Sequence, residues 1–249
     1  MNCRISKKKL KVFLDLGKMP IANGFIHKKN FKKEYFFPLK VAFSKHLSLV
    51  QIVSNPPPKK MFNKNYPFYT SSSKHMIEHF KKYSDWLKKK YLKKKGNLLE
   101  LGSNDGTFLE NFKGYHKVGF EPSESVHKLA KSKGIKSIND FFNFKSIKPF
   151  IKKKIKFDAI VGSNVICHIP DQVNLIKNFD KVLSKNGYII FEEPYLGSMY
   201  KKVSYDQIYD EHIYMFSVSS INKIYKSFGF KLIDTIPQNT HGGSMRYIV

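Results

Sequence analysis

The stretch Asn97–Phe108 constrains the fold of this chain more than any other segment does. Three leucines among residues 98–101 form a short apolar run that predicts a buried strand. Gly102 and Gly106 bracket the turn that follows, where the backbone can approach a ligand with no Cβ in the way. The stretch therefore predicts a strand that runs into a ligand-binding glycine turn.

Two carboxylates beside this turn indicate the kind of ligand. Glu100 precedes it and Asp105 lies within it. Acidic side chains suit a ligand that carries hydroxyl groups or a positive charge. A phosphate-binding loop instead presents bare N–H groups and often a lysine, and the first lysine after this turn is Lys113.

From residue 97 onward, strand-like and helix-like segments alternate. The predicted strands are 98–101, 118–121, 135–138, 157–162, 188–192, 230–236 and 247–249. The predicted helices begin near Gly106 and span about 123–133, 173–183 and 219–228. This alternation predicts an α/β fold with a doubly wound, mostly parallel, Rossmann-like sheet, which binds ligands at the carboxyl ends of its strands.

The first 60 residues have a different pattern. Residues 12–17, 36–43 and 47–53 are β-rich runs, and the prolines at 56–58 end the pattern. We expect a small β-rich unit over 1–60 and the main domain over 61–249. Ser73 is expected to cap the helix that precedes the first strand of that domain.

Composition limits the possible partners. The formal charge of +26 comes almost entirely from lysines spread along the chain, and Arg4 and Arg246 are the only arginines. Because arginine is the residue that reads bases and forks onto phosphates, we expect a solvated lysine surface and no nucleic-acid partner. The sequence has no run of 18 or more apolar residues, so we expect no helix that spans a membrane. With two cysteines and no apolar stretch after the basic start, a cytoplasmic location is expected.

Glu121 ends the second predicted strand, about 20 residues after the glycine turn, where an acid can hydrogen-bond the hydroxyls of a ribose. Residues 100–106 together with 119–123 resemble the first two motifs of class I S-adenosylmethionine (SAM) methyltransferases. Five further segments make the likeness narrower. Residues 16–25, 164–171, 192–196, 206–212 and 240–246 are similar to the nucleotide-sugar C-methyltransferases that methylate C-3 of deoxysugars.

This resemblance implies SAM as the cofactor and a nucleotide-linked keto-deoxysugar as the substrate. The residues that it implies for cofactor binding are Glu100, Gly102, Ser103, Asn104, Asp105, Gly106, Glu121, Pro122, Asn164 and His168. It also implies that a base removes the proton beside the C-4 keto group, after which the enolate carbon takes the methyl group. His212 is the expected base, because an imidazole titrates near neutral pH.

Neighbouring side chains are expected to assist His212. Glu211 or Tyr209 would orient the imidazole or stabilise the enolate oxygen. The resemblance also places a tyrosine from the loop before the first helix in the site, and Tyr66 and Tyr69 are both near that position. His168 and the segment 241–243 are second-rank pocket residues.

The sequence departs from the family in two respects. The family holds a structural zinc through two cysteine pairs. Here only Cys3 remains, and the positions of the other three cysteines hold Ser6, Ser44 and Leu47, so we expect no metal. Family members also continue into a further α/β domain that helps to hold the sugar nucleotide, whereas this sequence ends at Val249. We expect either a natural short form or a separate chain that supplies the missing domain.

Other functions stay open at this point. The chain could methylate another small molecule or a glycan, or it could be a non-catalytic SAM-binding remnant. A basic binding protein that serves a partner is the alternative from a different class.

Overall fold

The computed structural model describes residues 1–62, 66–92 and 95–249, which form two compact units. The first unit comprises Met1–Met61, Asn164–Val173 and Glu192–Val249, and the second comprises Phe62–Ser163 and Asn174–Phe191. Each unit is therefore assembled from segments that are far apart in the sequence. The domain boundary expected near residue 60 stays a prediction.

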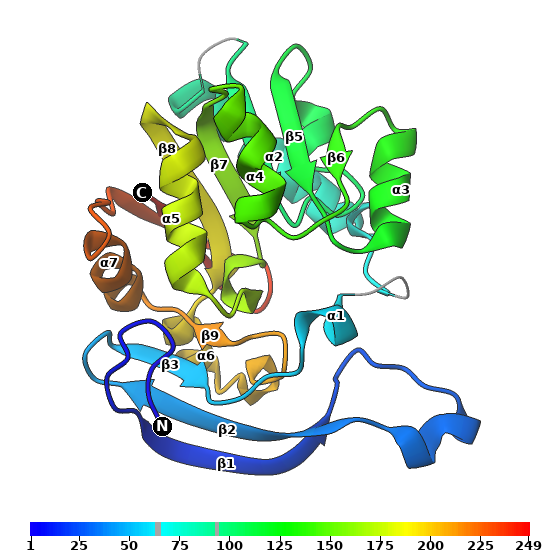
Figure 1. Cartoon of the computed structure of the whole chain (residues 1–249), viewed down its shortest axis with the longest axis vertical. Helices are drawn as coiled ribbons and strands as arrows, with labels where there is room; N and C mark the ends of the chain where they lie inside the picture. Colours follow the sequence, from blue (N-terminus) through cyan, green and yellow to red (C-terminus); the bar gives the residue numbers. More distant parts are fainter. Residues whose placement is uncertain (63–65, 93–94) are drawn as a thin grey trace. The chain divides into compact units, whose positions relative to one another are not determined.

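The first unit contains a four-stranded antiparallel sheet in the order β1-β2-β3-β9 (Figure 1). Its strands are β1 (Lys11–Pro20), β2 (Phe36–Ser44), β3 (Leu49–Ile52) and β9 (Tyr214–Met215). The β-rich pattern at the start of the chain is thus confirmed as sheet. Because β9 pairs with β3, the sheet also holds the segment that follows His212.

Short helices and two further strands complete this unit. The α-helices are α1 (Pro58–Met61), α6 (Leu196–Lys202) and α7 (Val218–Lys226). The 3₁₀ helices are η1 (Lys28–Lys33), η4 (Ile166–His168) and η5 (Tyr205–Gln207). Strands β10 (Asp234–Gln238) and β11 (Ser244–Ile248) pair with each other in antiparallel fashion.

The larger sheet has seven strands in the order β10-β11-β8-β7-β4-β5-β6. Its remaining strands are β4 (Asn97–Leu101), β5 (His116–Phe120), β6 (Ser137–Ile138), β7 (Phe157–Ser163) and β8 (Leu183–Pro194). β4 pairs in parallel with both β5 and β7, so the strand order reverses at β4. Such a reversal leaves a crevice at the carboxyl end of the strand, and here that end is the glycine turn. The predicted doubly wound sheet is confirmed.

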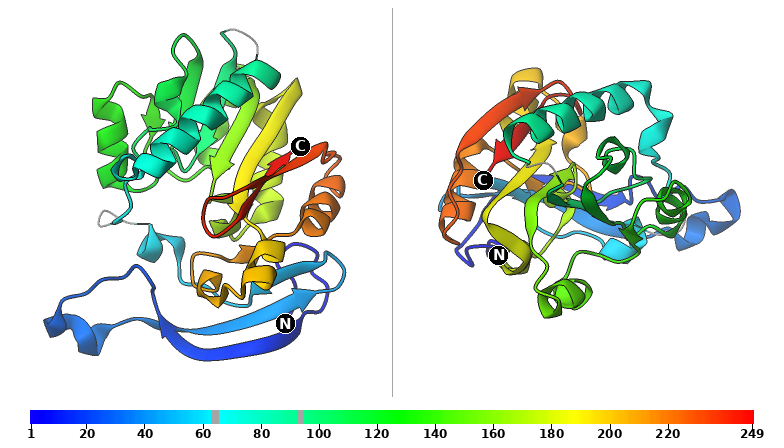
Figure 2. Two further views of the ribbon diagram at one scale, coloured as in Figure 1. Left: turned by 180° about the vertical axis from the view of Figure 1, so that it is seen from behind. Right: turned by 90° about the horizontal axis from the view of Figure 1, so that it is seen from above.

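Helices cover both faces of the sheet within the second unit. α4 (Phe144–Lys152) and α5 (Gln172–Val182) lie on one face, and α2 (Lys74–Lys90) lies on the other (Figures 1 and 2). The remaining helices of this unit are α3 (Glu124–Ser132), η2 (Thr70–Ser72) and η3 (Leu109–Asn111). The predicted cap is confirmed, because the Ser73 side chain accepts a hydrogen bond of 3.3 Å from the Met76 N–H.

The prediction of a helix that begins near Gly106 is wrong. Residues 107–111 form turns and end in the short helix η3. Asn111 explains this ending, because its side-chain Nδ2 donates to the carbonyl oxygens of Thr107 and Phe108 and so takes up acceptors that a longer helix would use. The glycine turn therefore leads into a compact loop.

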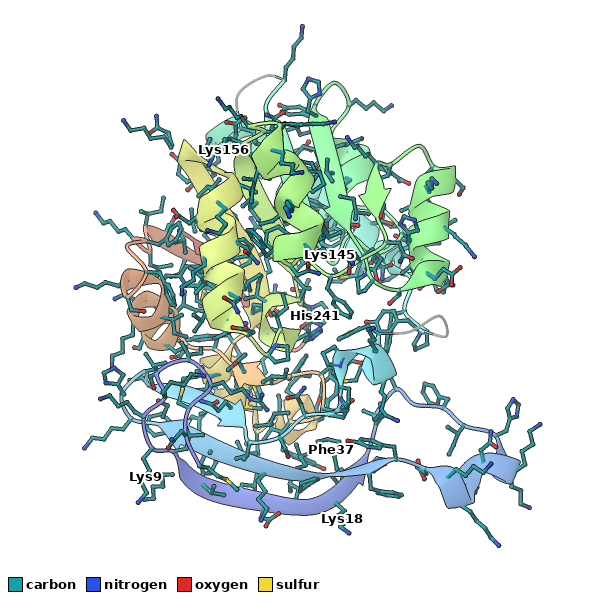
Figure 3. All side chains as sticks on the ribbon, in the orientation of Figure 1. Lys9, Lys18, Phe37, Lys145, Lys156 and His241 are labelled. Atoms are coloured by element: carbon teal, nitrogen blue, oxygen red, sulfur yellow. The ribbon has the colours of Figure 1, made fainter. Side chains whose placement is uncertain are left out.

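The lysines are spread over the surface of each unit. Lys9, Lys18, Lys145 and Lys156 are exposed, and Figure 3 labels them on four different segments. Among the described residues, no helix is long and apolar enough to cross a membrane.

Gly119 in β5 allows the glycine turn to approach the strand closely. A Cβ at this position would lie 2.5 Å from the Cβ of Ser103 and would also overlap the Ser103 hydroxyl. Ser103 stays against the strand because its N–H donates to the Phe120 carbonyl oxygen at 3.0 Å. The turn and β5 are thus held together by backbone contact.

We expect Gly119→Ala to lower the free energy of unfolding by about 1–3 kcal/mol, because the new methyl group overlaps Ser103. Urea unfolding measures this loss. Adding Ser103→Gly removes the overlapped side chain, so the double variant should recover part of the lost stability. A double variant no more stable than Gly119→Ala would contradict this explanation.

Candidate functional site

The glycine turn after β4 has a backbone that glycine makes possible. Gly102 and Gly106 have φ angles of +61° and +80°, in the left-handed region. Asn104 between them also has a positive φ, of +49°. Asparagine tolerates this conformation better than most residues do. The turn therefore folds back on itself at the switch point of the sheet.

Glu121 directs its carboxylate at this turn. Its Oε2 accepts a hydrogen bond of 3.0 Å from the Asn104 N–H, and its Oε1 accepts one of 2.7 Å from the Ser123 N–H. Burial raises the pKa of Glu121 even though these bonds oppose the shift. Pro122 follows, and its carbonyl oxygen accepts from Asn139 Nδ2 at 3.0 Å. Glu121 and the glycine turn, which the sequence predicts to lie together, are thus in direct contact.

Glu100 and Asp105 have different surroundings. Glu100 is buried, and within the described ranges its Oε2 has no hydrogen-bond partner. Burial, then Glu121 and then Asp105 raise the pKa of Glu100 well above its ordinary value. Burial alone would raise the pKa of Asp105, but hydrogen bonds from Ser71 and Thr107 hold it below its ordinary value. Glu100 can therefore still receive a ligand's donor, whereas Asp105 serves the turn itself.

The tyrosine loop before α2 is fixed to the same turn. Asn104 Oδ1 accepts from the Thr70 N–H at 3.0 Å, and Asn104 Nδ2 donates to the Phe68 carbonyl oxygen at 3.0 Å. Asp105 Oδ2 accepts from the Ser71 N–H at 2.9 Å. The ring of Tyr66 packs edge-on against Phe68, with centroids 5.6 Å apart. The structure thus brings the Tyr66 loop together with the predicted cofactor residues of the second unit.

The other predicted residues lie in the first unit, where Glu193 organises the segment that follows β7. Its Oε1 accepts from the N–H groups of Val165 and Ile166, at 3.2 and 2.7 Å. Its Oε2 accepts from the Cys167 N–H at 3.2 Å. Burial raises the pKa of Glu193 to about 7. One buried carboxylate therefore shapes the turn between Asn164 and His168.

His212 is held at both ring nitrogens. Nδ1 lies 2.9 Å from the Gln207 carbonyl oxygen, and Nε2 lies 3.1 Å from the Tyr209 hydroxyl. Because a carbonyl oxygen only accepts, the proton of the neutral ring belongs on Nδ1, and the Nε2 lone pair accepts from Tyr209. Burial, with a smaller effect from the nearby His241, lowers the pKa of His212 to about 4, although the Gln207 bond opposes the shift. This pKa is below the near-neutral value that the sequence predicts. His212 is thus a neutral imidazole with its lone pair on Nε2.

Two more histidines lie near His212. The His168 ring stacks on it with centroids 5.3 Å apart, and burial, His212 and His241 together lower the pKa of His168 well below its ordinary value. His241, labelled in Figure 3, is exposed and has a positive φ of 48°. The second-rank histidines of the sequence therefore gather around the predicted base.

Two buried acids precede His212. Asp210 Oδ1 accepts from the Ala22 N–H at 3.1 Å, and Glu211 Oε1 accepts from Asn23 Nδ2 at 2.7 Å. Burial raises the pKa of Glu211 to about 7, and it also raises the pKa of Asp210. Glu211 therefore changes its charge near neutral pH.

The donor atoms of Cys167, His168 and His212 lie within 4.8 Å of one another, a spacing that can hold a metal ion. However, burial and then Glu193 raise the pKa of the Cys167 thiol well above its ordinary value, whereas a metal binds the thiolate. Both nitrogens of His212 are also already in hydrogen bonds. The protonated thiol and the hydrogen-bonded imidazole therefore do not favour a metal ion at this cluster.

Sequence reasoning missed Asn23 and Glu193 as functional candidates. Both lie in segments that resemble the family, 16–25 and 192–196. The sequence signal for each is a polar side chain inside a family motif to which the expected reaction assigns no role. Their partners, however, are 188 and 26–28 residues away in the sequence. Only the fold shows those pairings.

A family model described as a putative zinc binding domain matches residues 3–62. The structure tests whether this chain can hold zinc there. Cys3 is buried, and its Sγ accepts a hydrogen bond of 3.2 Å from Gln51 Nε2. The positions matched to the other cysteines hold Ser6, Ser44 and Leu47, which cannot complete a tetrahedral site of thiolates and imidazoles. The residues present do not fit zinc.

Among curated proteins, the C-methyltransferase NovU of Streptomyces niveus is 26% identical over 236 residues. The match covers 93% of this chain, and the chain spans 56% of that relative's length.

Solved structures share the fold. The magnesium protoporphyrin IX methyltransferase of Synechocystis PCC 6803 with bound SAH has a TM-score of 0.53 and 15% identity, over 69% of this chain and 81% of that one. A SAM-dependent methyltransferase from Clostridium acetobutylicum ATCC 824 has a TM-score of 0.51 and 16% identity, over 68% and 90%.

A second family model, described as a methyltransferase domain, matches residues 76–235. This region is more than half of the chain. It contains β4 with its glycine turn, Glu121, the Glu193 turn and His212. The chain therefore belongs to the methyltransferase-domain family.

Proposed function

We propose that this protein is a SAM-dependent C-methyltransferase that acts on a nucleotide-linked keto-deoxysugar. The single observation that carries the proposal is the state of His212. It is a buried, neutral imidazole whose Nε2 lone pair meets the Tyr209 hydroxyl and whose Nδ1 is held by the Gln207 carbonyl. Proton removal beside a carbonyl needs an unprotonated base that is held in place, and His212 meets both needs although its pKa of about 4 makes it a weaker base than an ordinary imidazole. The likeness to NovU, named a C-methyltransferase, supports the choice of carbon as acceptor.

The glycine turn offers the features that SAM requires. Glu121 would accept the ribose hydroxyls, since each of its oxygens has a further lone pair beside the bond that it already accepts. The buried Oε2 of Glu100 would face the positive end of the cofactor. Gly102–Gly106 would admit the cofactor to the backbone, with Ser103 and Pro122 beside it. Asn164 and His168 are proposed as further cofactor contacts.

When bound, SAM supplies a methyl group on a sulfonium sulfur. The residues of this chain prepare the carbon that receives it. His212 Nε2 takes the proton from C-3, and the electron pair of that C–H bond forms the enolate with the C-4 carbonyl. Before this transfer, the Tyr209 hydroxyl turns from Nε2 to the C-4 carbonyl oxygen, which frees the Nε2 lone pair and lets Tyr209 stabilise the enolate oxygen as it forms. Tyr66 is proposed to contact the sugar from the loop fixed to the glycine turn.

Glu211 supports the imidazolium that this step creates. Asp206 is the acid that already raises the pKa of His212, and the ionised carboxylate of Glu211, the residue before His212, would add to this support of the positive ring. Two parts of the proposal rest on the family resemblance alone. These are the sugar nucleotide as substrate and a separate chain that would hold part of it.

Isothermal titration tests the cofactor site. We expect the folded protein to bind SAM, and Glu121→Gln to weaken binding about 10–100-fold, because charge-assisted hydrogen bonds to the ribose are lost. Glu110→Gln is the matched control, since the Glu110 carboxylate pairs with Lys133 at 3.1 Å and is partly exposed. Failure of the folded wild-type protein to bind SAM would exclude the methyltransferase activity.

Proton exchange tests the base. In deuterium oxide, the protein should exchange the C-3 proton of thymidine diphosphate-4-keto-6-deoxyglucose, followed by proton NMR. His212→Ala should slow this exchange at least about 100-fold, the usual contribution of a positioned base. His46→Ala, at an exposed position of the same unit, is the control. Exchange at the wild-type rate in His212→Ala would remove His212 from this role.

The pH profile of kcat/KM for exchange tests the role of Glu211. His212 has a pKa of about 4, so it is already neutral above pH 5 and should add no inflection near 6.5. Glu211 has a pKa of about 7, so the rate should rise as pH passes through 7 and its carboxylate forms. Glu211→Gln should abolish that limb. A limb that persists would belong to Glu193, whose pKa is also about 7, and would contradict the assignment.

A further inference from the structure

We propose that Asn23 is a positioning residue for the reaction and acts through Glu211. In this view the loop after β1 sets the charge of the acid beside the base, so the β-rich segment contributes to catalysis and not only to the fold. The inference rests on the proposed function, in which Glu211 and His212 act together. It also gives a role to the motif at residues 16–25, which the proposed reaction leaves without one.

Two adjacent residues of this loop bind two adjacent acids. Asn23 Nδ2 donates to Glu211 Oε1 at 2.7 Å, and the Ala22 N–H donates to Asp210 Oδ1 at 3.1 Å. Each pair is separated by 188 residues in the sequence. Glu211 is only 2% exposed, so water cannot easily replace the amide. The loop after β1 therefore supplies two hydrogen-bond donors, and the segment before His212 supplies the two acceptors.

The backbone of the loop presents these donors in a fixed direction. β1 ends at Pro20, which pairs with Phe36 of β2. The Gly24 N–H then donates to the Ile21 carbonyl oxygen at 3.0 Å and closes a tight turn. A Cβ on Gly24 would lie 3.1 Å from the Cβ of Ile21, closer than side chains normally approach. Ala22 and Asn23 occupy the middle of this turn.

The chemistry of an amide suits the task of holding an ionised acid. An amide N–H stabilises a carboxylate without adding a positive charge that would disfavour the imidazolium of His212. Asp210 and His212 flank Glu211 in sequence, and Cys167 is near enough for Glu211 to raise the pKa of its thiol. Burial and Asp210 both raise the pKa of Glu211, and the bond from Asn23 opposes them. Loss of that bond should leave Glu211 protonated at neutral pH.

The test follows the titration of Glu211 without any substrate. The full chain is labelled with carbon-13 at the glutamate side-chain carboxyl groups, and Glu211→Gln assigns the signal. Wild type should titrate near pH 7. Asn23→Ala should raise the midpoint by about one pH unit, the usual effect of losing one hydrogen bond to a charged group. Asn30→Ala, at an exposed position of the same unit, should not move it.

Asn23→Asp has almost the same shape and keeps the test decisive if Asn23→Ala unfolds. Its carboxylate would face Glu211, so the Glu211 midpoint should rise further than in Asn23→Ala. The exchange profile should then shift its limb to higher pH by the same amount. A midpoint unchanged in either folded variant overturns the inference. A shifted midpoint in a protein that exchanges no proton supports the positioning contact and rejects the proposed reaction instead.

Discussion

The hydrogen bond between His212 Nδ1 and the Gln207 carbonyl oxygen is the contact on which the site depends. It fixes the proton on Nδ1 and leaves the lone pair on Nε2, where it accepts from the Tyr209 hydroxyl and can take a reacting proton once that hydroxyl turns away. Burial adds to this effect, since it keeps the imidazole neutral over the working range of pH. Without that bond, the ring could present Nε2–H and could not act as a base at that atom.

Buried carboxylates arrange the surroundings of this histidine. Glu193 binds three consecutive N–H groups and so shapes the segment that carries His168. Glu211 and Asp210 in turn take their donors from the loop after β1. The four-stranded sheet supports that loop even though its cysteine pattern does not fit zinc. Polar contacts between distant segments therefore link the β-rich segment to the site.

Local sequence patterns predicted most of the fold. The apolar run before Gly102, the cap at Ser73 and the alternation of elements all depend on neighbouring residues, and all are confirmed. The helix after Gly106 was predicted wrongly, because a side chain of the loop, Asn111, binds its own backbone. Within the site, motifs identified the candidate residues. The bond of Asn23 to Glu211 joins residues whose separation of 188 positions carries no periodic signal.

The central claim is that His212 is a neutral base with its proton on Nδ1. Nitrogen-15 NMR of the histidine-labelled protein, with His212→Ala for assignment, measures this directly. At pH 7 we predict one protonated nitrogen, Nδ1, and one unprotonated nitrogen, Nε2, with no change of charge until the pH falls toward 4. A ring that is doubly protonated at pH 7, or that carries its proton on Nε2, would contradict the account.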